Sequence, residues 1–270
     1  MSLRVTILGC GSSGGVPRVG SGWGACDPAE PRNRRRRCSI FVEQTGLGER
    51  TGEAGTTTIL VDTSPDLREQ LLDAGVKRLD AVLYTHEHAD HTHGIDDLRG
   101  LVLTARRRVP VHLDEATATM MRARFLYCFE TPPGGDYPPI VDEHRLHAGT
   151  PVRVDGPGGP LEALPFALEH GSLDVLGFRF GDIAYTPDVS AIPDTALPAL
   201  AGLDLWIVDA LRIAPHPTHF NVEEALSWIE RMRPRRAVLT NLHTDLDYGT
   251  LRRSLPPGVE PAYDGMELGA

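Results

Sequence analysis

Cysteine and long apolar runs are scarce in this chain of 270 residues. Four Cys are too few for a disulfide scaffold, which needs a much denser set of cysteines. No uninterrupted apolar run reaches the roughly 18 residues of a membrane-spanning helix. The segment Met1–Gly15 has neither the basic start nor the apolar stretch of a signal peptide. We therefore expect a cytoplasmic protein with no membrane partner.

Basic residues are also fewer than acidic residues. The 27 Lys and Arg, of which only Lys77 is a lysine, face 37 Asp and Glu, so the formal net charge is −10. General nucleic-acid binding needs a positive surface, and no stable nucleic-acid complex is expected. The charged fraction of 24% and the apolar fraction of 41% are ordinary for a globular protein and exclude wholesale disorder.

Short apolar and β-branched runs alternate with helical patterns. The helix predicted at Asp66–Ala74 follows Pro65 and ends at Gly75, and the one at Asn221–Met232 opens with a capping pair. A third helix is predicted at Asp114–Phe125. Mixed strands and helices predict an α/β class with layered sheets. Strands are expected at Arg4–Leu8, Ser39–Gln44, Thr58–Asp62, Asp80–Thr85, Val109–Leu113, Val175–Phe180, Leu205–Asp209 and Ala237–Asn241.

No segment has the composition of a linker between independent domains. Gly46–Gly55 is typical of a hairpin tip, and Thr131–Pro139 and Asp155–Pro160 are Pro/Gly loops. No repeat with a period of about 20–50 residues is present. We therefore expect a single domain over residues 1–270.

A dense group of metal-binding side chains follows the strand at Asp80–Thr85. His86 and His88 are two residues apart, so both project to the same side of an extended chain. Asp90 and His91 come directly afterwards. Imidazole nitrogen together with carboxylate oxygen suits Zn, Mn or Fe. This segment predicts a metal site at the end of the strand.

The segment His86–His91 resembles the signature of the metallo-β-lactamase superfamily. The resemblance covers about residues 3–264 and implies a metallo-β-lactamase-like four-layer αββα sandwich with two divalent ions at one edge, Zn or Mn, with Fe as a third candidate. It implies that Asp188 bridges the two ions. The ligands implied for one ion are His86, His88 and His170. Those implied for the other are Asp90, His91 and His243.

Two further segments resemble the branch that contains tRNase Z and the PhnP-type cyclic phosphodiesterases. They are the Gly-rich start Leu8–Pro17 and the segment Val61–Arg68. The resemblance implies hydrolysis of a small phosphodiester or nucleotide-like substrate, cyclic ones included, by a metal-bridging hydroxide. It also implies a homodimer. Asp62, at a strand end, is either a support for a ligand histidine or a turn residue that leads into a helix.

The catalytic roles implied by this resemblance fall on Asp90 and His219. His219 lies just before the helix at Asn221–Met232, and helix N-termini favour phosphate anions. In this branch a histidine at that point protonates the leaving oxygen. His216 is either an alternative acid that contacts substrate or a plain loop residue.

The run Arg32–Arg37 is the main basic feature. Arginine binds phosphate in a bidentate manner, so Arg35 and Arg37 are candidates for binding a small phosphorylated substrate. The alternatives are a solvated charge run or ion pairs inside the protein. One departure from the branch concerns its structural zinc: the loop Gly20–Pro28 holds a single Cys, and Leu246 replaces an accompanying histidine, so such a zinc is not expected.

Two rival functions remain open. A thioester or lactam hydrolase would keep the metals and change the bond that is cleaved. A metal-binding regulatory protein without hydrolysis belongs to another class, and the complete ligand set disfavours it.

Overall fold

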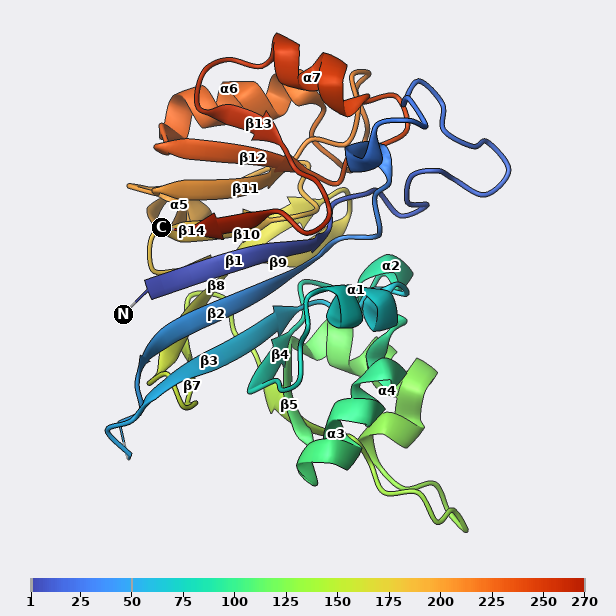
Figure 1. The fold of residues 1–270 in the computed structure, drawn as a ribbon, viewed down its shortest axis with the longest axis vertical. Helices are drawn as coiled ribbons and strands as arrows, with labels where there is room; N and C mark the ends of the chain where they lie inside the picture. The colour runs from blue at the N-terminus through green and yellow to red at the C-terminus, as the bar shows by residue number, and fades with distance from the viewer. Residues whose placement is uncertain (1, 50, 270) are drawn as a thin grey trace.

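Two seven-stranded sheets pack face to face in the computed structural model, which describes residues 2–49 and 51–269 (Figure 1). In spatial order the first sheet consists of β14 (Glu267–Gly269), β1 (Ser2–Gly9), β2 (Ser39–Leu47), β3 (Ala54–Val61), β4 (Ala81–Leu83), β5 (Val109–Leu113) and β6 (Val141–Arg145). The second consists of β13 (Val259–Pro261), β12 (Arg236–Thr240), β11 (Leu205–Asp209), β10 (Ile183–Thr186), β9 (Leu173–Phe180), β8 (Leu161–His170) and β7 (Val152–Val154).

The central strands are apolar on both faces because each sheet is covered on both sides. In β3, Ile59 and Val61 enter the core between the sheets, whereas Leu60 enters a second core on the outer face. In β11, Ile207 faces the other sheet and Trp206 faces outward into a third core. These runs therefore lack the apolar and polar alternation of a sheet with one wet face.

Helices cover the outer face of each sheet and complete four layers, αββα (Figure 1). The first sheet is covered by α1 (Leu67–Asp73), α3 (Arg99–Ala105), α4 (Glu115–Phe129) and the 3-10 helix Ile95–Leu98, near the short helix α2 (Ala89–Thr92). The second is covered by α5 (Leu197–Leu200), α6 (Val222–Met232) and α7 (Tyr248–Ser254). Two further 3-10 helices span Pro31–Asn33 and Asp194–Ala196. The predicted sandwich is confirmed.

The strands predicted from apolar runs are present, and the tip within Gly46–Gly55 joins β2 to β3 as expected. The capping pair at α6 also forms, with Asn221 Oδ1 accepting from the Glu224 amide at 2.9 Å. Among the described residues, no helix combines the length and apolarity needed to cross a bilayer.

Candidate metal centre

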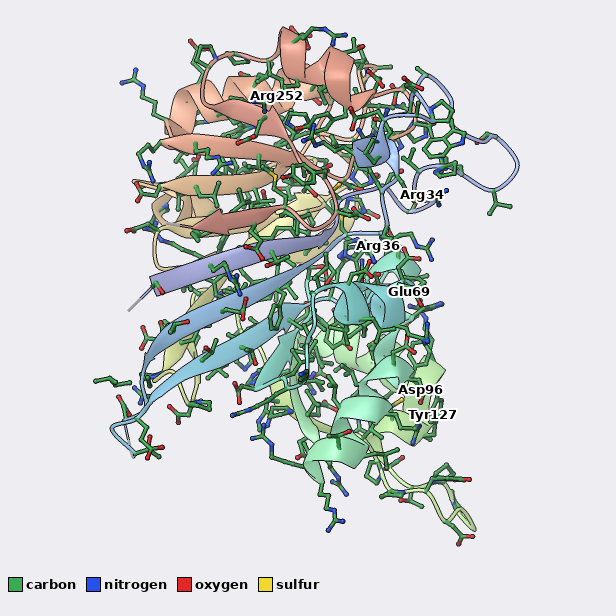
Figure 2. The ribbon with its side chains drawn as sticks, in the orientation of Figure 1. Arg34, Arg36, Glu69, Asp96, Tyr127 and Arg252 are labelled. Carbon is green, nitrogen blue, oxygen red and sulfur yellow. The ribbon has the colours of Figure 1, made fainter. Side chains whose placement is uncertain are left out.

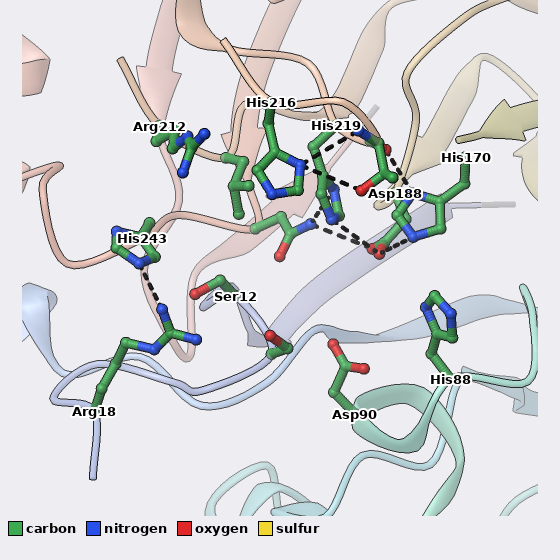
Figure 3. Close-up of a pocket in the computed structure, with 14 residues that line it drawn as sticks. Ser12, Arg18, His88, Asp90, His170, Asp188, Arg212, His216, His219 and His243 are labelled. Atoms are coloured by element: carbon green, nitrogen blue, oxygen red, sulfur yellow. Dashed lines mark hydrogen bonds and ion pairs between the residues drawn. The ribbon is translucent and has the colours of Figure 1, made fainter. Parts of the chain in front are cut away.

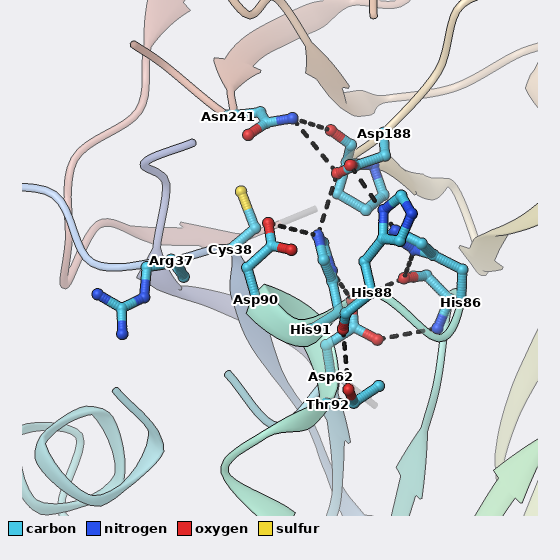
Figure 4. A network of polar contacts seen from close by, with 12 residues as sticks. Arg37, Cys38, Asp62, His86, His88, Asp90, His91, Thr92, Asp188 and Asn241 are labelled. Carbon is cyan, nitrogen blue, oxygen red and sulfur yellow. Dashed lines mark hydrogen bonds and ion pairs between the residues drawn. The ribbon is translucent and has the colours of Figure 1, made fainter. Parts of the chain in front are cut away.

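The ligands predicted from the sequence lie at one edge of the sandwich because each follows the end of a strand. His86 and His88 lie on the extended segment after β4, and α2 begins directly after His88. His170 is the last residue of β8, and Asp188 comes two residues after β10. Figure 4 shows His86, His88 and Asp188 converging on one point. The two sheets therefore each supply part of the site.

Four of these side chains form a compact donor set. One ligand atom from each of His86, His88, His170 and Asp188 lies within 4.8 Å of all the others. Asp188 Oδ2 is 3.8 Å from His86 Nε2 and 3.7 Å from His170 Nε2. Three imidazoles and one carboxylate at this spacing match the ligands of a divalent transition metal.

Hydrogen bonds on the far side of each ring aim the Nε2 lone pairs at the site. Thr85 Oγ1 donates to Asp62 at 2.8 Å, so it accepts the Nδ1–H of His86 at 3.0 Å. His170 donates its Nδ1–H to the carbonyl of Thr218 at 2.6 Å, because a carbonyl can only accept. Both rings are thereby fixed in the tautomer that a metal ligand needs.

Asp62 supports His91 in the same way. Its Oδ2 lies 2.7 Å from His91 Nδ1, and both side chains are fully buried. His91 Nε2 then faces Asp188 Oδ1 at 3.2 Å and Asp90 Oδ2 at 3.5 Å. Asp62, whose role the sequence left open, thus holds the ring of His91 in place.

The buried nitrogens fit a bound cation. His86 Nε2 and His91 Nε2 are buried and have no hydrogen-bond partner among the described residues, which is costly for a polar atom. Burial, together with neighbouring His91, lowers the pKa of His86 well below its usual value, so the ring is neutral and its lone pair is free. Bound divalent ions would satisfy both nitrogens.

His219 stands beside this cluster and is paired with a buried carboxylate. Its Nδ1 is 2.8 Å from Asp209 Oδ2, and its Nε2 is 3.9 Å from Asp188 Oδ2. Burial lowers the pKa of His219, but the hydrogen bond and charge of Asp209 outweigh it and raise the pKa to about 8. Asp209 was not among the predicted site residues, although it ends a predicted strand as Asp62 does.

His243 lies on the same cavity but outside the donor set. Arg18 Nη1 is 2.6 Å from its Nε2, and Asp245 Oδ1 is 3.0 Å from its Nδ1 (Figure 3). An arginine can only donate, so His243 Nε2 is the acceptor and its Nδ1–H donates to Asp245. The residue that faces Asp188 after β12 is instead Asn241, with its Nδ2 3.3 Å from Asp188 Oδ1. Asn241 was not among the predicted site residues either.

Most of the run Arg32–Arg37 is engaged inside the protein. The prediction that Arg35 binds substrate is wrong: the side chain is buried and donates to the carbonyl of Leu246 at 2.7 Å and to that of His243 at 3.3 Å. Arg36, which is labelled in Figure 2, pairs with Asp264 and with Asp73 of α1. These ion pairs are the alternative left open by the sequence.

Arg37 is half-buried beside Asp66, with its Nε 3.1 Å from Asp66 Oδ2. It lines an outer groove together with Arg18 and Asp90, so its role in substrate binding stays a prediction.

The donor set opens into a polar cavity of about 260 Å³. His216 lies on its wall, with its ring centroid 5.1 Å from that of His219, and its role in substrate binding stays a prediction. Leu211 is the single apolar side chain among its lining residues. The lining consists of Ser12, Ser13, Arg18, His88, Asp90, His170, Asp188, Leu211, Arg212, His216, Thr218, His219, Asn241 and His243 (Figure 3).

The family model described as "Beta-lactamase superfamily domain" matches residues 57–241, more than half of the chain. That span includes His86–His91, His170 and Asp188. The chain belongs to this superfamily. Its resemblance to the PhnP and tRNase Z branch is also confirmed: a solved structure described as a new diphosphatase from the PhnP family is 36% identical, with a TM-score of 0.86, over 100% of this chain and 98% of its own.

Two further proteins are similar to this chain. Human tRNase Z, short form, is 18% identical with a TM-score of 0.60 over 98% of each chain, which shows the shared fold. A curated protein from Porphyromonas gingivalis named octanoyltransferase is 33% identical over 98% of this chain. The match spans 51% of that protein, so the chain covers about half the length of this relative.

Proposed function

We propose that this protein is a binuclear metal-dependent phosphodiesterase that hydrolyses a small phosphodiester or diphosphate diester, nucleotide-like or cyclic. The observation that carries the proposal is the His/Asp donor set lying beside the His219–Asp209 pair in one polar cavity. The similarity to the structure described as a PhnP-family diphosphatase supports it.

The metals, when bound, supply activated water and neutralise phosphoryl charge. The donor set of His86, His88, His170 and Asp188 would hold one, and Asp90 and His91 would share in holding the other. His219 has a proton to give at neutral pH because the Asp209 carboxylate raises its pKa. With its Nδ1 on Asp209, His219 can donate from Nε2 to the leaving oxygen.

Two arginines in the cavity favour phosphate over other substrates. Neither Arg18 nor Arg212 makes an ion pair with a carboxylate among the described residues, although the chain has an acidic surplus. Arg212 is held by the carbonyls of Ala214 and Pro215 at 3.1 and 2.7 Å. Guanidinium groups kept free of carboxylates are suited to phosphoryl oxygens.

The lining of this cavity does not favour a thioester substrate. An acyl chain needs apolar walls, and Leu211 alone provides one. The name octanoyltransferase describes a protein about twice as long as the part matched here, so its activity does not carry over to this chain. Phosphate chemistry therefore fits the lining better than acyl chemistry.

The test is a substrate panel with added Mn or Zn. We expect turnover of bis-p-nitrophenyl phosphate, a cyclic nucleotide or a dinucleoside diphosphate, and none of thioesters or lactams. Asp90→Ala should abolish turnover, whereas the exposed Asp136→Ala serves as the matched control. Thioester or lactam turnover alone would overturn the proposal, and bound metal without any hydrolysis would favour the regulatory alternative.

A further inference from the structure

The glycine-rich segment after β1 brings a serine to the wall of the metal cavity. β1 ends at Gly9, and Ser12 lies three residues further along the chain. Ser12 borders the same cavity as the donor set, on the side of Arg18 and His243 (Figure 3). The volume of this cavity is about 260 Å³, so a phosphoryl group bound beside the donor set would lie close to Ser12.

The glycines before Ser12 are required by the close approach of the neighbouring chain. A Cβ at Gly9 would lie 2.0 Å from the carbonyl oxygen of Arg37, and one at Gly11 would lie 2.9 Å from that of Arg35. Both distances are too short for a real Cβ, so a larger residue would push the two backbones apart. The glycine-rich segment is therefore packed directly against the residues that lead into β2.

Backbone hydrogen bonds fix the position of Ser12 in the cavity wall. Its amide donates to the carbonyl of Leu242 at 3.3 Å, and its carbonyl accepts from the Gly15 amide at 2.7 Å. The adjacent Gly11 amide donates to the carbonyl of Arg36 at 2.7 Å. Ser12 is thus held between the segment that precedes β2 in the first sheet and the segment that follows β12 in the second.

The hydroxyl of Ser12 has no partner among the described residues. Ser12 is 2% exposed, and its Oγ is buried without a hydrogen bond. Buried hydroxyls are nearly always paired, because an unpaired one has given up its hydrogen bonds to water. Two ligand nitrogens at this site, His86 Nε2 and His91 Nε2, are unpaired in the same way. The partner of Ser12 Oγ is therefore a group that enters the cavity.

We propose that Ser12 is a catalytic residue that donates a hydrogen bond to a non-bridging oxygen of the phosphoryl group under attack. These oxygens carry the spread negative charge of the transition state, and those that face away from the donor set need donors from the chain. A hydroxyl can donate, whereas the carboxylates of the site can only accept. This inference rests on the proposed phosphodiesterase function.

Ser12 is a donor in this reaction and not a nucleophile. A serine nucleophile is activated by a base that accepts its proton, and Ser12 Oγ has no such acceptor among the described side chains. Its proton stays on Oγ throughout, and no bond to Ser12 forms or breaks. Its contribution is a fixed hydrogen bond that is already in place before the substrate arrives.

Substitution of Ser12 tests this role in the metal-loaded full chain. In Ser12→Ala we expect kcat/KM for a dinucleoside phosphodiester to fall by about 10- to 100-fold, the effect of one hydrogen bond to a charged group. Ser21→Ala, an exposed serine in the same loop, should keep the wild-type rate. Circular dichroism and elemental analysis should show that both variants keep the fold and the metal content of the wild type.

Sulfur substitution identifies the oxygen that Ser12 contacts. Sulfur accepts hydrogen bonds weakly, so the wild type should be slow on the phosphorothioate diastereomer that turns sulfur toward Ser12. Replacing Mn²⁺ by the sulfur-binding Cd²⁺ should not restore that rate, because this sulfur lies away from the metals. Ser12→Ala should lose most of the difference between this diastereomer and the oxygen substrate.

Three results would overturn the inference. They are full activity in folded Ser12→Ala, loss of bound metal in that variant, and a wild type in which Cd²⁺ restores the rate on both diastereomers. The third needs no variant and decides the question if Ser12→Ala does not fold. Failure of the metal-loaded wild type to hydrolyse any phosphodiester would instead overturn the proposed function.

Discussion

His219 depends on a buried carboxylate for its protonation and its orientation. Asp209 has no exposed side-chain surface; burial raises its pKa, whereas the hydrogen bond from His219 lowers it and favours the charged pair. Asp209 also accepts from the Val189 amide at 3.1 Å, which fixes the carboxylate next to Asp188. A histidine held at Nδ1 presents Nε2 to the cavity, where a leaving oxygen would need its proton.

The leaving group decides how much His219 contributes. In His219→Gln we expect hydrolysis of a diester with an alkoxide leaving group to fall by about 10²–10⁴-fold, the range of general acid catalysis. Nitrophenolate needs little protonation, so bis-p-nitrophenyl phosphate should lose far less. Rates on the two substrates, compared with His147→Gln, check this. Equal losses on both would show that His219 acts in some way other than as an acid.

The long loop between β1 and β2 is held to the C-terminal part of the chain by hydrogen bonds. Asp247, the N-cap of α7, accepts from the Thr250 amide at 2.9 Å through Oδ1. Its Oδ2 accepts from Asn33 Nδ2 at 2.7 Å and from the Asp27 amide at 3.2 Å. Arg35 adds its contact to Leu246 from the same loop. Asp247 is thus one of the anchors at the far end of the loop that carries Arg18.

At acid pH we expect the loop between β1 and β2 to lose its hydrogen bonds to Asp247. Burial raises the pKa of Asp247, but the hydrogen bonds from Asn33, Thr250 and Asp27 outweigh it and lower the pKa from 3.8 to about 2. A lowered carboxylate pKa means that its stabilising effect is present above pH 3.8 and is lost as the pH falls toward about 2.

Hydrogen exchange of residues 18–33 should therefore accelerate over that interval in the wild type. Asp247→Asn should show fast exchange at every pH, because its amide cannot replace both carboxylate oxygens as acceptors. Exchange that does not depend on pH in the wild type would contradict this.

The local sequence pattern predicted those strands whose formation depends on their own residues. The apolar runs of β3, β4 and β11 are visible because both of their faces are buried. β8 was missed because Pro165 interrupts it, yet its residues from Leu164 to His170 pair with β9. β14 was missed because its three residues form a strand only by pairing with β1 from the other end of the chain.

The site residues also divide into those that a local sequence pattern predicts and those that depend on distant contacts. His86, His88, Asp90 and His91 were predictable because one short segment carries them all. The contact of Asn241 with Asp188 was not, because it depends on the left-handed backbone at Asn241. Arg35 was misassigned because an arginine run gives no sign of which side chain is buried.

At the scale of the whole molecule, the metal centre joins the two sheets. The segment His86–His91 follows a strand of the first sheet, whereas His170 and Asp188 follow strands of the second. The apolar core between the sheets holds them together in the interior, and the metal ligands meet at its edge. An ion bound there restrains both halves at once and has no equivalent site in the unfolded chain.

Metal removal should therefore lower thermal stability. An ion present at about 100 times its Kd stabilises the folded state by about 2.7 kcal/mol, which in a chain of this size shifts Tm by roughly 5–10 °C. Scanning calorimetry with and without a chelator measures the shift. His86→Ala, which removes one side chain of the donor set, should show a much smaller shift on chelation. If wild type and His86→Ala respond equally to the chelator, the metal that stabilises the fold lies elsewhere, and the link between the sheets rests on the apolar core alone.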